Sequence, residues 1–322
     1  MLTRQINMAG FIFKNGFLCE IPRLLLLPVL ILLASCALLA CSPSKEPTPA
    51  PTSAAKAPTL TASPPPLTPT PLPPSATPAD PILTPTPNCQ SKPGQIVKGI
   101  IDTALLDKPM TYTVYLPPCY DVETDRRYPV LYLLHGQNFT EDQWQRIGAP
   151  AAADKLIAAG EMPPFIIVFP YDHSYKQPRE YRFEEVFLEL LVPQIDRAFR
   201  TQPDPGHRAV GGLSRGGAWA LRLGLYHPGI FGAIGAHSPA IFHTDTNSLP
   251  LVVRDLPADR LPRIFIDTGD SDSEFEVVTR FKDFLNEHNI PHEWHEYIGF
   301  HDEKYWSAHV EEYLRWYAEG WE

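Results

Sequence analysis

The residues best suited to chemistry are Gly212-Leu213-Ser214-Arg215-Gly216, which have the spacing G-x-S-x-G. An apolar run precedes them and a segment of helical character follows them. Paired glycines allow a tight strand-to-helix turn, which holds the serine hydroxyl out above the edge of a sheet. The alternative is a glycine-rich turn with a capping serine, but the strand before and the helix after favour a nucleophile. The pattern therefore predicts that Ser214 attacks a substrate as a nucleophile.

A serine hydroxyl needs a base, and the base must be oriented by an acid. In proteins with this turn, the chain order is serine, acid, histidine. The acidic loop after the strand at 263–268 offers Asp270 and Asp272, whereas Asp267 lies inside the strand pattern and is expected to be structural. His301 follows a glycine turn after the next strand. We therefore predict His301 as the base and one of the two loop aspartates as the acid.

The charge that develops on a substrate oxygen during acyl transfer needs two preorganised N–H donors. We predict one from the backbone of Arg215, directly after the nucleophile, and one from a loop that follows an early strand. The strand at 130–134 runs into His135 and Gly136, so the backbone N–H of Gln137 is the expected second donor. His135 precedes the serine in the chain, so we expect it to shape this loop rather than to act as the base.

No metal site is predicted. The acidic loop at 270–275 superficially resembles a calcium loop, but Phe275 stands where the glycine should be. His292 and His295 share a predicted strand, and their spacing puts them on opposite faces, which makes them poor co-ligands. We expect neither a metal nor an organic cofactor.

The elements that must position these residues alternate between strands and helices. Strands are predicted at 111–117, 130–134, 165–169, 208–212, 231–236, 263–268 and 293–298, and helices at 151–159, 181–200, 215–226, 274–289 and 305–317. Continuous apolar strands separated by helices are typical of a mostly parallel sheet that is covered on both faces. The predicted fold class is α/β.

Proline is concentrated ahead of this α/β region: 16 of the 37 prolines lie in residues 42–87. That segment has no aromatic residue and cannot bury enough apolar surface to offset the entropy of ordering. We therefore expect three parts, namely a lipoprotein signal peptide at 1–41, a disordered linker at 42–87 and one large domain at 88–322.

The N-terminal segment is typical of an export signal, with basic residues before an apolar run at 24–39. Cys36 and Cys41 both follow residues that resemble a bacterial lipobox, in which the cysteine is lipidated. Cys36 has the better match before it, whereas Cys41 leads directly into the linker, and we favour Cys41. The alternative is an uncleaved anchor helix, although Pro28 interrupts the run. Both interpretations place the domain outside the cytoplasm, tethered to a membrane.

The charge of the chain argues against nucleic acid as a partner. The formal net charge is −10, the acidic excess falls on the domain, and the domain has no cluster of basic residues that could bind phosphates.

Cys89 and Cys119 are the domain's two cysteines. In an exported protein such a pair is expected to be bridged, the alternative being two unrelated thiols.

With these features assembled, the domain resembles the esterase D family of α/β-hydrolases, which includes feruloyl and acetylxylan esterases, siderophore esterases, S-formylglutathione hydrolases and mycolyltransferases. The resemblance spans nearly all of residues 94–320 and rests on VYLPPCYD, YPVLYLLHG, Trp144, GLSRGG, DTGDSDS and HDEKYWSAHVEEYL. The family's acid aligns with the second loop aspartate, so the resemblance implies a Ser214–Asp272–His301 triad. Asp270 stays as the alternative acid.

The resemblance implies a membrane-tethered serine esterase that cleaves carboxylic esters through an acyl-enzyme. The expected substrate is a small-molecule or polysaccharide ester, bound in a cleft for which Phe139, Trp144 and Trp306 are candidate lining residues, together with Tyr171 and Tyr175. One alternative is an acyltransferase that uses the same triad. The other is a non-catalytic envelope binding lipoprotein, against which the order of the triad residues argues.

Overall fold

The computed structural model describes residues 88–322. The predicted signal peptide, both lipobox cysteines and the proline-rich linker lie outside these residues. Within residues 88–322, no helix has the length and apolar character needed to cross a membrane.

One eight-stranded sheet runs through the domain in the order β1-β2-β4-β3-β5-β6-β7-β8. β1 pairs antiparallel with β2, and β2 with β4, whereas all the other neighbouring pairs are parallel. The strands are β1 Gln95–Ile101, β2 Met110–Leu116, β3 Val130–Leu134, β4 Ile166–Pro170, β5 Arg208–Leu213, β6 Ala233–His237, β7 Arg263–Gly269 and β8 Glu293–Tyr297. Because β3 to β8 are parallel, the loops at their carboxyl ends meet along one edge of the sheet.

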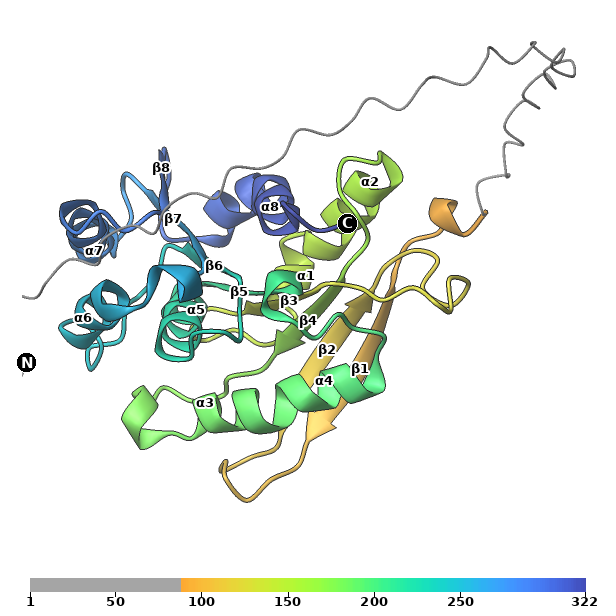
Figure 1. The fold of residues 1–322 in the computed structure, drawn as a ribbon, viewed down its shortest axis with the longest axis horizontal. Coiled ribbons are helices and arrows are strands. Elements are labelled where there is room, and N and C mark those ends of the chain that lie inside the picture. The colour runs from red at the N-terminus through yellow and green to blue at the C-terminus, as the bar shows by residue number, and fades with distance from the viewer. Residues whose placement is uncertain (1–87) are drawn as a thin grey trace, which may run out of the picture. The chain divides into compact units, whose positions relative to one another are not determined.

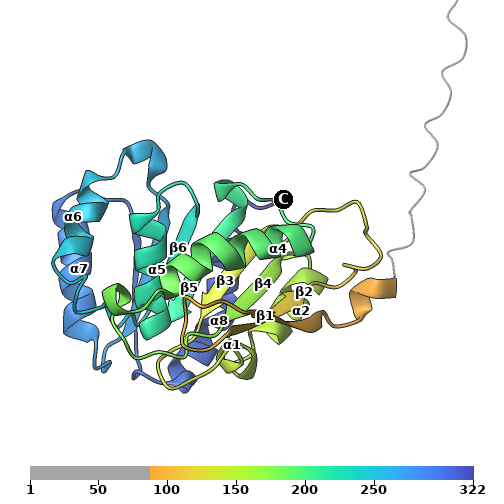
Figure 2. The same ribbon diagram turned by 90° about the horizontal axis from the view of Figure 1, so that it is seen from below.

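Helices cover both faces of the sheet (Figures 1 and 2). Along β3, Val130, Tyr132 and Leu134 join one apolar cluster, whereas Leu131 and Leu133 join the other. The helices of the first face are α3 Phe183–Glu185, α4 Val192–Ala198, α5 Arg215–Tyr226, α6 Ser248–Asp255 and α7 Phe275–Glu287, and those of the second are α1 Gln143–Arg146, α2 Ala149–Ala158 and α8 Glu303–Ala318. The predicted α/β-hydrolase fold, with a mostly parallel sheet between two helical layers, is confirmed.

The helix predicted at 181–200 is not one regular helix. It consists of α3, a π-helical turn at Val186–Leu191 and α4. Pro193 explains the break, because proline has no N–H to donate and its ring crowds the carbonyl four residues earlier. A π turn carries one extra residue per turn and accommodates this clash.

Among the strands and α-helices, three were missing from the sequence-based prediction, namely β1, α1 and α6. α1 has only four residues, too few to show a helical period. β1 is an edge strand whose side chains are mostly exposed, so it has no continuous apolar run. α6 has only eight residues and carries Pro250 in its first turn, which obscures its helical spacing.

Cys89 and Cys119 form a disulfide that fastens the start of the domain to the turn after β2. The two cysteines are 30 residues apart in sequence, and in the chain-entropy model closing such a loop contributes about 3.5 kcal/mol to the free energy of unfolding. Replacing both cysteines by serine should therefore lower the urea-derived free energy of unfolding by about this amount. Reduced wild-type protein should match the double variant, and equal stability of the oxidised and reduced forms would contradict the prediction.

Candidate active site

Ser214 stands at the sharp turn between β5 and α5. Its backbone has φ 52° and ψ −116°, a conformation that non-glycine residues rarely adopt. Hydrogen bonds on both sides hold it there: the Ser214 N–H donates to the His237 carbonyl at 2.9 Å, and the Ser214 carbonyl accepts from the Ala240 N–H at 3.0 Å. The turn presents the hydroxyl at the carboxyl edge of the sheet.

The two glycine positions of G-x-S-x-G have no room for a Cβ atom. A Cβ atom on Gly212 would lie 2.2 Å from the carbonyl carbon of Gly216, and a Cβ on Gly216 would lie 2.2 Å from the carbonyl oxygen of Leu134. Both contacts are with backbone, which cannot swing aside as a side chain can. The motif therefore brings the start of α5 directly against β5 and the end of β3.

Replacing Gly216 by alanine should consequently destabilise the fold by about 3 kcal/mol, at the upper end of the usual cost of overpacking. Thermal unfolding of the purified variant measures this loss. Gly206→Ala is the matched control, because a Cβ there would meet only the carboxylate end of the Asp204 side chain, at 3.2 Å. An unchanged melting temperature for Gly216→Ala would contradict the argument.

The structure brings Ser214, His301 and Asp272 together. His301 Nε2 lies 2.8 Å from Ser214 Oγ, while His301 Nδ1 lies 2.8 Å and 3.0 Å from the two carboxylate oxygens of Asp272. The ring therefore connects the nucleophile to the acid. This is the geometry in which a histidine accepts a serine proton while a carboxylate fixes its tautomer.

Asp272 is held as a carboxylate. Burial by itself raises the pKa of this carboxyl, but hydrogen bonds from the His301 ring and from the Glu274 N–H outweigh it, and the pKa lies below its usual range. The Asp272 side chain has no exposed surface, whereas the His301 side chain is 23% exposed. The acid is thus enclosed, and the histidine faces the cleft.

Asp270, the alternative acid, points elsewhere. Its carboxylate accepts hydrogen bonds from the Gly299 N–H and the Ser271 hydroxyl, both at 3.1 Å. Asp270 therefore braces the loop that leads to His301 but makes no contact with the ring.

The predicted oxyanion donors border the same space. Gln137, Ser214 and His301 line one cleft of about 430 Å³, and a Cβ on Gly136 would lie only 3.6 Å from the Ser214 Cβ. Within residues 88–322, the Gln137 and Arg215 N–H groups have no hydrogen-bond partner. Both donors are free to bind an oxygen held above Ser214.

Two side chains that are nearly inaccessible to solvent shape the loop that carries Gln137. The His135 ring contacts the Gly136 carbonyl through Nδ1 at 2.7 Å and accepts from the Asp172 N–H through Nε2 at 3.0 Å. Burial lowers the pKa of His135, which favours the neutral ring that this pattern requires. The Gln143 amide oxygen accepts from the Gly136 N–H at 2.7 Å. His135 therefore supports the loop that carries Gln137.

The Arg215 side chain turns away from the nucleophile. Its guanidinium donates to the Asp172 carboxylate at 2.7 Å and to the Lys176 carbonyl at 2.8 Å, and the Trp219 indole donates to the same carboxylate at 2.7 Å. These buried contacts join the loop after β4 to the start of α5. Neither Asp172 nor Gln143 was predicted from the sequence. The available signal was that Asp172 lies two residues after the apolar strand β4.

The aromatic residues predicted to line the cleft divide into two groups. Phe139 and Trp306 do line it, and the Trp306 ring stands edge-on to His301 with centroids 5.1 Å apart. Trp144 does not, which corrects the prediction. It is 1% exposed and donates its indole N–H to the Leu134 carbonyl at 2.9 Å, so it supports the end of β3 from below. Tyr171 and Tyr175 line a small adjoining cavity of about 80 Å³.

Asp267, predicted to be structural, is fully buried at the end of β7. Its carboxylate contacts His237 Nδ1 at 2.6 Å and accepts from the hydroxyls of Tyr305 and Tyr313 at 2.7 Å and 2.8 Å. His237 also contacts the Tyr317 hydroxyl at 2.9 Å. This network fastens α8 beneath β6 and β7 and keeps the His237 ring fully buried.

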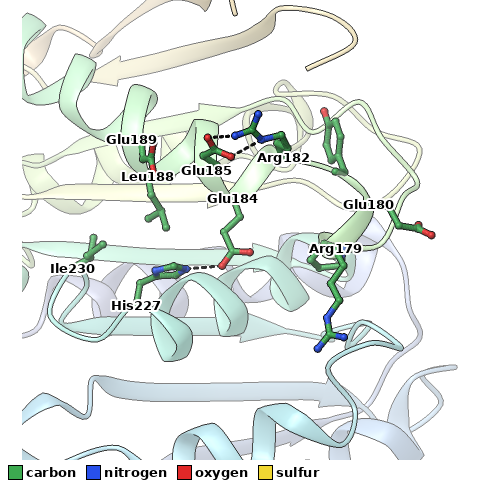
Figure 3. A pocket seen from close by; sticks show the side chains of 11 residues that line it. Arg179, Glu180, Arg182, Glu184, Glu185, Leu188, Glu189, His227 and Ile230 are labelled. Atoms are coloured by element: carbon green, nitrogen blue, oxygen red, sulfur yellow. Dashed lines mark hydrogen bonds and ion pairs between the residues drawn. The ribbon is translucent and has the colours of Figure 1, made fainter. Parts of the chain in front are cut away.

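A larger cavity, of about 700 Å³, lies between the segment at 178–189, which includes α3, and the end of α5 at His227 and Ile230 (Figure 3). Its charged groups are partly paired with one another: Glu184 contacts His227 at 2.5 Å, and Arg182 pairs with Glu185. Among residues 88–322, no serine or cysteine lines this cavity. The chemistry therefore belongs to the smaller cleft at Ser214.

A family model described as "Putative esterase" matches residues 103–317. The chain is 34% identical over 177 residues to an endo-1,4-beta-xylanase/feruloyl esterase of Xylanibacter ruminicola, covering 52% of this chain and 23% of that protein. It is 30% identical over 242 residues to Esterase Rv1288 of Mycobacterium tuberculosis, covering 58% of this chain and 51% of that protein. The chain thus spans about a quarter to a half of the length of these relatives.

A solved ferulic acid esterase has a similar structure, with a TM-score of 0.64 and 27% sequence identity. The match covers 70% of this chain and 98% of that one. The similarity therefore includes nearly the whole of that esterase.

Proposed function

Because the chain belongs to the esterase family whose model covers residues 103–317, we propose that it hydrolyses carboxylic esters with Ser214 as the nucleophile. The single observation that carries this proposal is the continuous contact from Ser214 through His301 to Asp272, beside the backbone N–H groups of Gln137 and Arg215.

The first half of the reaction transfers the acyl group to the enzyme. Ser214 Oγ attacks the ester carbonyl carbon while His301 Nε2 takes its proton, and Asp272 stabilises the positive ring. The N–H groups of Gln137 and Arg215 hold the resulting oxyanion. His301 then delivers the proton to the ester oxygen, the bond from carbon to that oxygen breaks, and the alcohol leaves.

The second half releases the acid. A water molecule attacks the acyl carbon and gives a proton to His301, and a second tetrahedral intermediate forms in the same oxyanion site. The bond to Ser214 Oγ breaks as His301 returns the proton to it. The chain's own groups account for every proton transfer in both halves.

We propose aromatic acyl esters of plant polysaccharides as the substrate class. The names of the xylanase/feruloyl esterase relative and of the solved ferulic acid esterase support this choice. Phe139, Tyr171 and Tyr175 add aromatic surface beside the oxyanion loop, where an aromatic acid can bind.

We propose that the enzyme acts outside the cytoplasm on a membrane tether. The apolar run at 24–39 and the two lipobox-like cysteines support export and lipidation. The disulfide between Cys89 and Cys119 is in keeping with an oxidising compartment. Labelling cells with radioactive palmitate and separating membrane from soluble fractions tests this proposal, which predicts a labelled protein in the membrane fraction.

The activity itself is tested with the purified protein and a panel of esters that includes p-nitrophenyl acetate, methyl ferulate and feruloylated arabinoxylan. A fluorophosphonate should stop hydrolysis, and peptide mass spectrometry should place the adduct on Ser214. Hydrolysis of none of the esters, or an adduct on another serine, would overturn the proposal.

A further inference from the structure

The cleft at Ser214 has two chemically different sides. His301 must deliver its proton to the ester oxygen, so the departing alcohol has to lie on the His301 side of Ser214. The acyl group then lies toward the oxyanion loop, where Gln137, Asn138 and Phe139 connect the cleft to the small tyrosine-lined cavity. Residues around His301 therefore contact the departing alcohol, and their charge attracts or repels it.

The alcohol side is acidic. Glu274, Asp302 and Glu303 line the cleft around His301, and no lysine or arginine is among its lining residues in the described part of the chain. Two of these carboxylates are already engaged. Asp302 accepts from the Tyr305 N–H at 2.9 Å and caps α8, while Glu303 contacts the Gln143 amide at 3.2 Å and pairs with Arg146 at 3.0 Å.

Glu274 differs from the other two. Within residues 88–322, its side-chain carboxylate has no hydrogen bond or ion pair, and although it stands at the N-cap of α7 it does not cap that helix. Its backbone is fixed, because the Glu274 N–H donates to Asp272 at 2.7 Å. A half-buried, unpaired carboxylate is thus held two residues from the catalytic acid, facing the space into which the alcohol leaves.

We propose that Glu274 determines which alcohols the enzyme releases, favouring cationic alcohols and neutral, hydroxyl-bearing alcohols such as unmodified sugars over anionic ones such as uronates or phosphorylated alcohols. This inference rests on the proposed ester hydrolysis. A hydroxyl can donate a hydrogen bond to the free carboxylate, whereas a second negative charge is repelled by it in a cleft that is only partly open to water.

Three aryl acetates of similar shape test the inference on the purified protein: 3-(trimethylammonio)phenyl acetate, 3-tert-butylphenyl acetate and 3-sulfonatophenyl acetate. The acyl group is constant, and dividing each kcat/KM by the hydroxide-catalysed rate corrects for the different reactivity of the leaving phenols. The corrected kcat/KM should fall in the order cation, neutral, anion, with the cation at least roughly tenfold above the anion at low ionic strength. The ratio should shrink as salt is added, because salt screens the charge.

The variant Glu274→Gln assigns the effect to one residue. It keeps the backbone N–H that donates to Asp272, and it should lower the cation-to-anion ratio by roughly three- to tenfold. Glu287→Gln is the matched control, because it removes the same charge from the exposed far end of α7 and should leave the ratio unchanged.

The outcomes separate this inference from the proposed function. Hydrolysis of all three esters with equal corrected kcat/KM would overturn the charge selection and leave the esterase activity standing. A wild-type preference that survives in Glu274→Gln would overturn the assignment to Glu274, and the salt dependence of the wild type tests the selection even if that variant fails to fold. Hydrolysis of none of the esters would overturn the proposed function itself.

Discussion

Replacing Ser214 by alanine should reduce kcat for p-nitrophenyl acetate by about 10⁶-fold, the size of loss seen when a triad serine is removed. Ser214 Oγ is the hydroxyl that His301 Nε2 contacts, so the substitution removes the group that we propose forms the acyl-enzyme. Stopped and continuous hydrolysis assays measure the loss. The fluorophosphonate adduct should disappear with it.

The residual rate of Ser214→Ala reports on the oxyanion site. The Gln137 and Arg215 N–H groups belong to the backbone, so the substitution leaves them in place, and a residual rate of about 10³–10⁴ over water is expected from the oxyanion site and binding alone. A residual rate no higher than that of the reaction in water would contradict a preorganised oxyanion site beside Ser214. Thermal unfolding should stay near wild type, because the substitution removes one hydroxyl from a turn that backbone hydrogen bonds hold in place.

Ser307→Ala is the matched control for this loss. Ser307 is an exposed residue of α8, close in sequence to His301, and within residues 88–322 its side chain makes no hydrogen bond. Full activity is expected in this variant. Wild-type activity in Ser214→Ala, or equal losses in both variants, would reject Ser214 as the nucleophile.

The nucleophile turn could be predicted from sequence because its motif is local. The two glycines, the serine and the apolar run before them lie within nine residues, and the steric demand on Gly212 comes from Gly216. The demand on Gly216 comes instead from the backbone of Leu134 at the end of β3, which only the fold brings close. The sheet could be predicted for a similar reason, since its parallel strands are short continuous apolar runs. β1 escaped prediction because an edge strand lacks that signal.

The supporting contacts could not be predicted, because they join residues far apart in the chain. Arg215 and Asp172 are separated by 43 residues, and Gln143 meets Glu303 across 160. Nothing in either local sequence indicates the partner. The error at Trp144 has the same origin: an aromatic residue near a cleft can face it or lie beneath it, and only the packing of β3 against α1 decides.

The local sequence could not show which of Asp270 and Asp272 is the acid of the triad. Both lie on one short loop with the same charge. The Asp272 N–H donates to the Gly269 carbonyl at 3.1 Å, while the Ser271 N–H donates to the Gly299 carbonyl at 3.0 Å, and this pair of bonds turns one carboxylate toward His301 and the other toward Gly299. The outcome depends on β8 and the loop after it, not on the aspartates.

Asp272→Asn should therefore lower kcat by about 10⁴-fold, whereas Asp270→Asn should lower it by less than about tenfold. Asp272 accepts the Nδ1 proton of His301, so that the Nε2 lone pair faces Ser214 Oγ. An asparagine can offer its own N–H to Nδ1 and move the ring proton to Nε2, where it blocks acceptance of the serine proton. Asp270 acts only by bracing Gly299, and an asparagine carbonyl can still accept that hydrogen bond.

The pH dependence of the free energy of unfolding tests whether Asp272 is ionised in the folded protein. The pKa of Asp272 is lower in the folded protein than its usual value of about 4, so the carboxylate stabilises the fold above that pH, and this stabilisation is lost as the pH falls through the folded pKa. The stability difference between wild type and Asp272→Asn should thus be largest at neutral pH and shrink below about pH 4 in urea titrations. A larger loss of kcat in Asp270→Asn than in Asp272→Asn would instead make Asp270 the acid, and would require the loop to turn the other way when substrate binds.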